Sequence, residues 1–437
     1  MNIRTTRIAA ALAAAMLALP IAACGASDTG AEGPVTIRFN WWGSDTRAKL
    51  QQEVIDKFEA KYPDIKVETE TSNYDDYITK LSTAAASGTL PDVMTMVDPF
   101  VYDYMDTGSL LDLSTASEQL DLSAFPEDSF SDVLGEQGEK YAVSLGSAGH
   151  GLAINPAVFE KYGVAIPDDE TWSWEDFEKA AKEISEKSDG DAVGLNLEPT
   201  EQIANCWVRQ QGQWFGMGPG GEPAVNFDAA TLAGYLQFEK KLIDEGATNS
   251  PDQMQELSSA GASPEQSLLA QDKAGISLIS MNQLSQFEEA AGHELQPVLW
   301  PGETQAPARG GWVKQSQYLA ISANTAHPEA AATFVDYLVN DEEAGTIMGL
   351  DRGVPVNPNV LKAVQADTSG ADQRFAEWVE RSNAVNTQPF YRLNTGAAAA
   401  LSSGAYSRAH EALIFGQSSP EQAAEAFKGE LESAATN

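Results

Sequence analysis

The sequence predicts an α/β protein in which short strands alternate with crossover helices. Residues 35–40 alternate apolar and polar side chains, which is the period of a half-buried strand. Residues 65–70 and the continuous apolar run 93–97 predict two further strands. Apolar side chains four residues apart, such as Val54 and Phe58, predict a helix in the first of the two intervals. Strands that alternate with helices in this way pack as a parallel sheet.

Large and polar side chains follow the predicted strands at the point where each strand ends. The first strand runs into Trp41 and Trp42 and is followed by Ser44 and Asp45, and the third strand is followed by Asp98. Ligands of open α/β sheets bind at this carboxyl edge, so these residues are candidate ligand contacts. The alternative is that the tryptophans pack in the core and that the two acids cap helices or turns.

The N-terminus has the pattern of a secretory leader. Two arginines precede the apolar run 8–19, which is shorter than the roughly 20 residues that span a bilayer. Small residues then lead to Cys24, which resembles the bacterial lipoprotein cleavage box. We therefore expect a signal peptide at 1–23 and a lipidated tether at 24–34, with Cys24 as the acylated residue. The alternative is an ordinary signal peptide in which the cysteine is incidental.

The charge balance excludes some partners. Sixty-four acids against 27 bases give a net charge of −37, and loss of the leader with its two arginines lowers it to −39. A chain this acidic is not expected to bind nucleic acid, although it permits a cationic ligand. With Cys24 lipidated, Cys206 is the only thiol left, so no intramolecular disulfide is available.

Three stretches rich in glycine and proline are candidate connections between domains. They are residues 146–151, 300–312 and 352–357, where the composition allows bending and unusual backbone angles. Helical patterns fill most of the chain between and after them, for example the helix that Ser173 and Asp176 open with a capping box.

The sequence contains few residue patterns that are typical of catalytic sites. The four histidines lie far apart without metal-ligand spacing, and neither a nucleophile elbow nor a phosphate-binding loop occurs. Carboxylate pairs for glycoside hydrolysis are uninformative, because 64 acids place some pair at any spacing. The sequence thus predicts no catalytic residue, no metal site and no cofactor. The positive signal is the repeated placement of Trp, Asp, Asn and Gln at strand ends.

The order of several motifs resembles the extracellular solute-binding proteins of family 1, the carbohydrate-binding components of ABC importers. The motifs are the cysteine box, Trp41–Asp45, Ser87–Val93, Tyr141–Asn155, Thr171–Phe177, Gly310–Trp312, His327–Ala331 and Arg352–Pro355. The resemblance covers nearly the whole mature chain. It implies a two-lobed, periplasmic-binding-protein-like type II fold with three interlobe crossings and a ligand cleft. The implied lobes are 35–146 plus 313–355 and 147–312 plus 356–437.

The resemblance also implies a set of ligand contacts. They are Trp42, Ser44, Asp45, Asp98, Ser147, Trp207, Trp214, Asn282, Trp312, Arg352 and Tyr391. Asn282 falls where many relatives have a tryptophan, so another tryptophan would have to supply that platform. Strand alternation, combined with the family register, turns Trp42 and Asp45 toward the cleft and leaves Trp41 to pack on the other side.

The function implied is binding rather than catalysis. We expect a monomeric lipoprotein on the extracytoplasmic face of the cell membrane that captures a sugar or oligosaccharide and delivers it to an ABC permease. One alternative is a binding protein for a polyamine or another cationic solute, which would use several carboxylates and an aromatic box. A more distant alternative is a surface enzyme that degrades polysaccharides.

Overall fold

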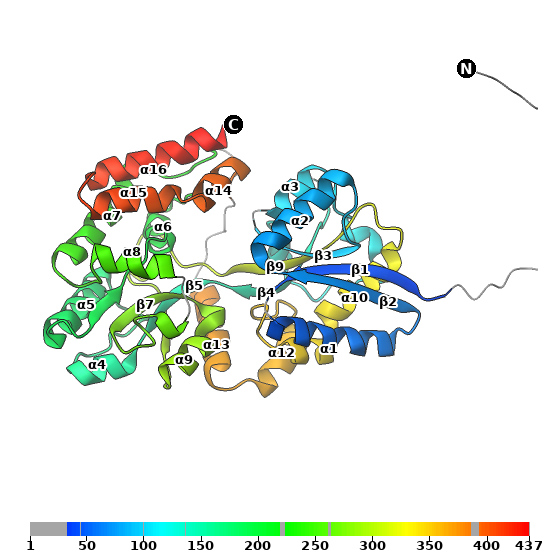
Figure 1. Ribbon diagram of the computed structural model, residues 1–437, viewed down its shortest axis with the longest axis horizontal. Helices are drawn as coiled ribbons and strands as arrows, with labels where there is room; N and C mark the ends of the chain where they lie inside the picture. Colours follow the sequence, from blue (N-terminus) through cyan, green and yellow to red (C-terminus); the bar gives the residue numbers. More distant parts are fainter. Residues whose placement is uncertain are drawn as a thin grey trace, which may run out of the picture. The chain divides into compact units, whose positions relative to one another are not determined.

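Two β-sheets and the helices that cover them form the fold in the computed structural model (Figure 1). The structure describes residues 33–43, 45–98, 100–135, 137–218, 223–260, 264–385 and 393–436. In the order in which they pair, the strands of the first sheet are β2 (Ile65–Ser72), β1 (Val35–Trp42), β3 (Val93–Met96), β9 (Lys314–Ile321) and β4 (Val143–Ala148). Those of the second sheet are β6 (Val193–Asn196), β7 (Ala274–Ser280), β5 (His150–Ile154) and β8 (Gln296–Val298).

The three strands predicted near the N-terminus are confirmed. Strand β1 pairs in parallel with β2 and with β3. Ile37, Phe39 and Trp41 are at most 2% exposed, whereas the intervening residues of β1 are partly or fully exposed. The first sheet is nevertheless mixed, because β9 lies antiparallel between β3 and β4.

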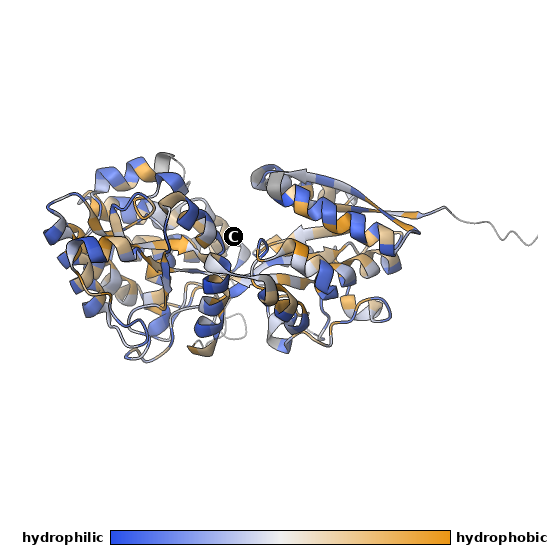
Figure 2. Cartoon of the chain, turned by 90° about the horizontal axis from the view of Figure 1, so that it is seen from below, coloured by the Kyte–Doolittle hydropathy of each residue, from blue (hydrophilic) through white to orange (hydrophobic). Residues whose placement is uncertain are grey.

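Each sheet has its own layer of helices. Around the first sheet lie α1 (Asp45–Lys61), α2 (Tyr74–Ser87), α3 (Phe100–Asp106), α10 (Pro328–Asn340), α11 (Glu342–Met348) and α12 (Pro358–Asp367). Most of these helices carry both hydrophilic and hydrophobic turns, as expected of helices with one buried face (Figure 2).

The second sheet is covered by a larger set of helices. They are α4 (Pro156–Tyr162), α5 (Trp174–Ser188), α6 (Gln202–Gln210), α7 (Ala229–Asp244), α8 (Pro251–Ala260), α9 (Leu284–Ala291), α13 (Gly370–Val385), α14 (Thr395–Ser402), α15 (Ala405–Ile414) and α16 (Pro420–Ala435). The predicted capping box of Ser173 and Asp176 opens α5. Among the described residues, no helix is long and apolar enough to cross a membrane.

The chain passes between the sheets at two of the predicted connections. It leaves the first sheet between β4 and β5, at Gly149, and returns between β8 and β9. The third predicted connection, 352–357, bridges β4 through Ser147 and Val354. It leads into α12, which packs on α10 and α11, and the chain reaches the layer of the second sheet at α13. The lobe boundaries drawn from the sequence remain a prediction.

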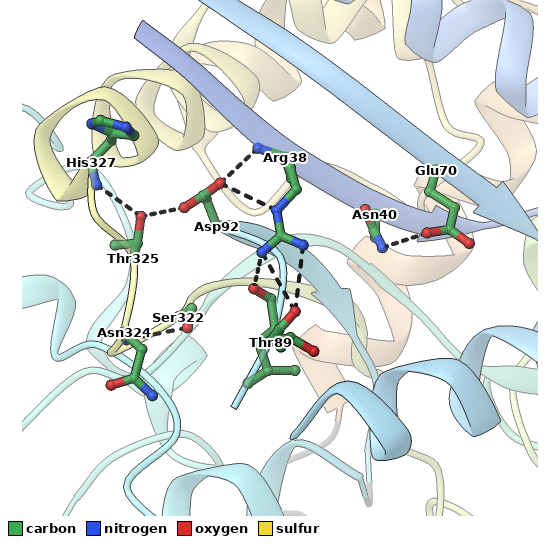
Figure 3. A network of polar contacts seen from close by, with 10 residues as sticks. Arg38, Asn40, Glu70, Thr89, Asp92, Ser322, Asn324, Thr325 and His327 are labelled. Carbon is green, nitrogen blue, oxygen red and sulfur yellow. Dashed lines mark hydrogen bonds and ion pairs between the residues drawn. The ribbon is translucent and has the colours of Figure 1, made fainter. Parts of the chain in front are cut away.

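A buried carboxylate ties three strands of the first sheet together (Figure 3). Asp92, just before β3, accepts a hydrogen bond from the Arg38 backbone N–H of β1 at 2.8 Å. Its other oxygen accepts from the Thr325 hydroxyl beyond β9, and its carbonyl accepts from the Ser322 N–H. The Arg38 guanidinium donates to the Leu90 carbonyl. These bonds fix the register of β1, β3 and β9 at the end of the sheet opposite to Asp98.

In the second sheet, Gly194 lets helix and strand approach closely. It lies in β6, and a Cβ at this position would overlap the backbone carbonyl of Ala181 in α5. Backbone cannot yield as a side chain can, so any larger residue must push α5 away from β6.

We expect Gly194→Ala to lower the free energy of unfolding by about 1–3 kcal/mol, because it overpacks the contact between α5 and β6. Urea denaturation followed by circular dichroism measures the change. The matched control is Gly429→Ala in α16, where the added methyl meets no atom. That control should raise stability by about 0.5–1 kcal/mol. Equal stability of Gly194→Ala and the parent chain would contradict the packing described here.

Candidate functional site

An aromatic cluster lies at the end of β1. The Trp42 ring is partly buried and packs against Tyr74 at 5.5 Å and Tyr77 at 5.4 Å between ring centroids, both from α2. Trp41 faces the core, is 2% exposed and packs on Phe39. The prediction that Trp41 packs in the core is therefore confirmed, because adjacent residues of a strand face opposite ways, and the direction of Trp42 toward a ligand cleft stays a prediction.

An ion pair joins the end of β3 to the start of β9. Asp98 lies just beyond β3, and its carboxylate is 2.9 Å from the Lys314 ammonium. The Asp98 side chain is 13% exposed, so the pair is sheltered from solvent on the acid's side. Burial, assisted by the charges of Asp98 and Asp132, raises the pKa of Tyr102 in α3. Asp98 thus lies in a partly buried ion pair at the end of a strand.

The charge of the same ammonium group also acts on two residues beside the second sheet. His150 begins β5 opposite Ser280 at the end of β7. Burial, with a smaller effect of the Lys314 charge, lowers the pKa of His150 to about 4, so its imidazole is neutral at pH 7. Glu201 directly precedes α6, and burial raises its pKa although Lys314 acts in the opposite sense. The charge of Lys314 therefore acts on groups of both sheets, through a direct ion pair in the first and at longer range in the second.

Two further polar residues lie at the carboxyl edge of the second sheet. Glu198 follows β6, accepts a hydrogen bond from the Asn196 side chain at 3.3 Å, and has its pKa raised by burial. Asn282 follows β7, which is parallel to β6, and its side-chain oxygen accepts from the Ser280 hydroxyl at 2.8 Å. Together with His150, these residues give this edge acids, an amide and a neutral imidazole.

Two predicted site residues are buried in the scaffold. Trp312 is 4% exposed, stacks on Trp300 at 6.1 Å and lies next to the Arg209 guanidinium. Arg352 is 4% exposed and donates to the side chains of Gln317 and Gln51. Neither presents its functional group to solvent in this structure, and the roles expected from the sequence, an aromatic platform for Trp312 and a wall contact for Arg352, stay predictions. Both were predicted from the family register, which does not show what neighbouring side chains cover.

Three more predicted contacts have partners within the protein. Trp207 of α6 packs against Trp174, Tyr235 and Phe238 at 5.2–6.1 Å between centroids. Trp214 donates its indole N–H to the Met217 carbonyl. Ser147 donates to the Gln315 side chain at 3.2 Å. A role in ligand binding stays a prediction for these three.

Other predicted residues lie outside the described part of the chain. They are Cys24, Ser44 and Tyr391, and of Asp45 only the backbone is described, as the first residue of α1.

A cavity of about 670 Å³ lies beside the connections between the sheets. Ser147 and Gln315 line it, together with Val354 and residues of α12 and α13. Lys314 also lines it and so belongs both to this cavity and to the strand-end group. Its volume falls in the range of small-molecule sites. Across the described ranges, no group of His, Cys, Asp and Glu side chains could hold a metal ion.

Sequence reasoning missed Lys314, His150, Glu198 and Glu201. His150 lies inside the glycine-rich connection, and Glu198 follows the predicted strand at 193–197. Both positions carry the strand-end signal that singled out Asp98. Lys314 and Glu201 offered no such signal, because their relevance depends on which segments the fold brings together.

The comparison with protein families shows to which family the chain belongs. Residues 42–345 match the model of the bacterial extracellular solute-binding proteins. The chain belongs to this family. It is 27% identical over 365 residues to an uncharacterized lipoprotein of Streptomyces antibioticus, covering 82% of this chain and 78% of that protein. It is 26% identical to a lactose-binding protein of Rhizobium radiobacter, over 52% of this chain and 53% of that protein.

A solved structure shows the same solute-binding fold. A family 1 solute-binding protein of Alicyclobacillus acidocaldarius superposes with a TM-score of 0.73 at 24% identity. The match covers 93% of this chain and 100% of that one. The two-sheet α/β architecture is therefore the type II arrangement expected from the sequence.

The partly buried imidazole of His150 predicts that acid lowers the stability of the fold. His150 binds a proton in the unfolded chain below about pH 6.5 but in the folded chain only near pH 4. Stability is therefore lost as the pH falls through this window. His150→Gln should reduce the loss between pH 7 and pH 4.5 by about 2–3 kcal/mol in urea titrations. His327→Gln, which removes an exposed imidazole, is the control. Identical losses in His150→Gln and the parent chain would refute this assignment.

Proposed function

We propose that the protein captures a sugar or oligosaccharide between its two lobes and delivers it to the permease of an ABC importer. The observation that carries the proposal is the position of Lys314, whose ammonium pairs with Asp98 of the first sheet at 2.9 Å and whose charge also acts on His150 and Glu201 beside the second sheet. A ligand held there touches both lobes, so it stabilises whichever arrangement of the lobes brings these groups closest.

The chemistry of the strand ends suits a saccharide. Sugars present apolar C–H faces, on which an aromatic ring stacks, and a rim of hydroxyls that needs donors and acceptors. Trp42, supported by two tyrosines, supplies the ring. Asp98, Asn282 and the acids of the second sheet supply acceptors, and Lys314 supplies a donor. Ser44, Asp45 and Tyr391 are further proposed contacts. The lactose-binding relative supports a carbohydrate ligand.

Binding without chemical conversion is the proposed activity. The acids that sit at the strand ends either pair with Lys314 or accept hydrogen bonds from amides and hydroxyls. The family to which the chain belongs consists of solute-binding proteins.

The proposed location is the extracytoplasmic face of the cell membrane. Cys24 would carry the lipid, and residues 24–34 would tether the domain. The similarity to a protein described as a lipoprotein supports this location.

A ligand screen tests the function. Thermal-shift measurements with neutral oligosaccharides, polyamines and amino acids should show stabilisation by saccharides, and Trp42→Ala should weaken binding of the best saccharide about tenfold because stacking is lost. Phe415→Ala removes another partly exposed ring, 38% exposed after α15, and should bind normally. Stabilisation by spermidine alone would favour a polyamine-binding protein, and release of reducing ends would favour an enzyme.

Lipidation can be tested in cells. We expect Cys24→Ser to move the protein from the membrane fraction to the soluble extracytoplasmic fraction, because acylation at this residue is the proposed anchor. Cys206→Ser removes a buried thiol in α6 and should remain in the membrane fraction. Retention of Cys24→Ser in the membrane fraction would exclude this anchor.

A further inference from the structure

We propose that the helices of the second sheet carry an additional saccharide site, in which Trp174 and Trp207 bind a short unit of a neutral sugar chain. The site goes beyond the proposed function, because the residues that line it belong to the start of α5, the end of α6 and the loop 302–307. A ligand bound there contacts elements of the second sheet and leaves the ends of the first sheet free.

A cavity of about 330 Å³ lies between these three segments. Its volume is close to the lower limit of small-molecule sites, which is roughly 300 Å³. The cavity is at the end of α6 opposite to Glu201, and this helix of nine residues is about 13.5 Å long. The cavity is therefore separated from Glu201 by the length of a helix.

Two tryptophan rings form the aromatic wall of the cavity. Trp174 and Trp207 are both partly exposed, and their centroids lie 5.2 Å apart with the ring planes inclined at 56°. Phe238 packs on both rings, at 5.6 Å from Trp174 and 5.7 Å from Trp207. Trp172 differs, because it is 3% exposed and donates its indole N–H to the Leu299 carbonyl. The chain thus buries Trp172 in the core and leaves the Trp174 ring accessible for stacking.

Buried hydrogen bonds hold the Trp174 ring in place. Gln210 is 1% exposed, accepts the Trp174 indole N–H at 2.8 Å and donates to the Pro301 carbonyl at 2.7 Å. Gly302 has a φ of +79°, and a Cβ at this position would come within 2.8 Å of the Trp174 ring. Glycine therefore lets the loop close against the ring. A ring that is fixed before a ligand arrives lowers the entropic cost of binding.

The polar groups around the rings suit a neutral ligand with hydroxyls. Gln305 donates its amide N–H to the Thr171 carbonyl at 2.8 Å, which leaves its side-chain oxygen as an acceptor. The exposed amide of Gln211 can donate and accept. Among the described residues that line the cavity, Glu175 alone is charged, and it would repel a uronate. An aromatic face beside uncharged amides is the combination that binds the C–H faces and hydroxyls of a neutral sugar.

Affinity electrophoresis of the mature chain in native gels tests the site. The gels contain amylopectin, dextran, laminarin or galactan, and a gel without polysaccharide gives the reference mobility. We expect at least one of these polymers to retard the parent chain. Trp174→Ala should weaken this binding at least about tenfold, because the stacking surface is lost.

A second variant protects the test against misfolding of Trp174→Ala. Ala306→Leu narrows the cavity from the side of the loop and leaves both tryptophans in place, so it should weaken retardation to a similar extent. Phe415→Ala removes a ring outside the cavity and should be retarded like the parent chain. Trp42→Ala, which tests the proposed ligand cleft, should also be retarded normally.

The outcomes separate this inference from the proposed function. If none of the four polymers retards the parent chain, or if both cavity variants are retarded like the parent, the inference is wrong and the proposed function stands. Loss of retardation in Trp42→Ala alone would assign the polymer to the cleft and would also overturn the inference. An oligoproline peptide that binds the parent chain but not Trp174→Ala, in the absence of retardation by polysaccharide, would show that the cavity is a peptide site.

Discussion

Strand β9 is the constraint on which both halves of the molecule depend. It lies in the middle of the first sheet, between β3 and β4, although the chain enters it from the second sheet. Carboxylates fix it at both ends, with Asp98 at Lys314 and Asp92 at the residues that follow Ile321. The first sheet cannot be completed until a segment from far along the chain has arrived. Such long-range pairing costs loop-closure entropy and makes the two halves interdependent.

The same strand defines the electrostatics of the candidate site. Because β9 begins with Lys314, it places one ammonium group where strands of both sheets end. That charge is shared unequally, since Asp98 forms the direct ion pair while Glu201 and His150 interact with it at longer range. The outcome is a sheltered ion pair at the point where the chain enters the first sheet. Buried charges of this kind are costly, and a complementary ligand offsets part of that cost.

The role of a tryptophan can be predicted from the sequence only where local geometry fixes the direction of its side chain. Strand alternation separated Trp41 from Trp42 correctly, because the side-chain period of a strand is fixed by backbone geometry. No such rule applies to Trp207 and Trp312, whose surroundings are set by helices and loops distant in sequence. Aromatic rings pack in a core as readily as they bind a ligand, so the residue type alone does not distinguish a packing role from a binding role.

The sequence by itself determined the α/β class, the strands of the first βαβαβ segment, the helix caps and the position of the glycine-rich connections. These features follow from local periodicity and turn chemistry, which need no knowledge of distant partners. Only the tertiary structure decided that β9 is antiparallel within the first sheet, that Arg352 is buried, and that Lys314 pairs with Asp98. The physical reason is that burial and electrostatic environment are properties of segments brought together from distant parts of the chain. Burial and electrostatic environment are therefore set by packing and cannot be inferred from the local sequence.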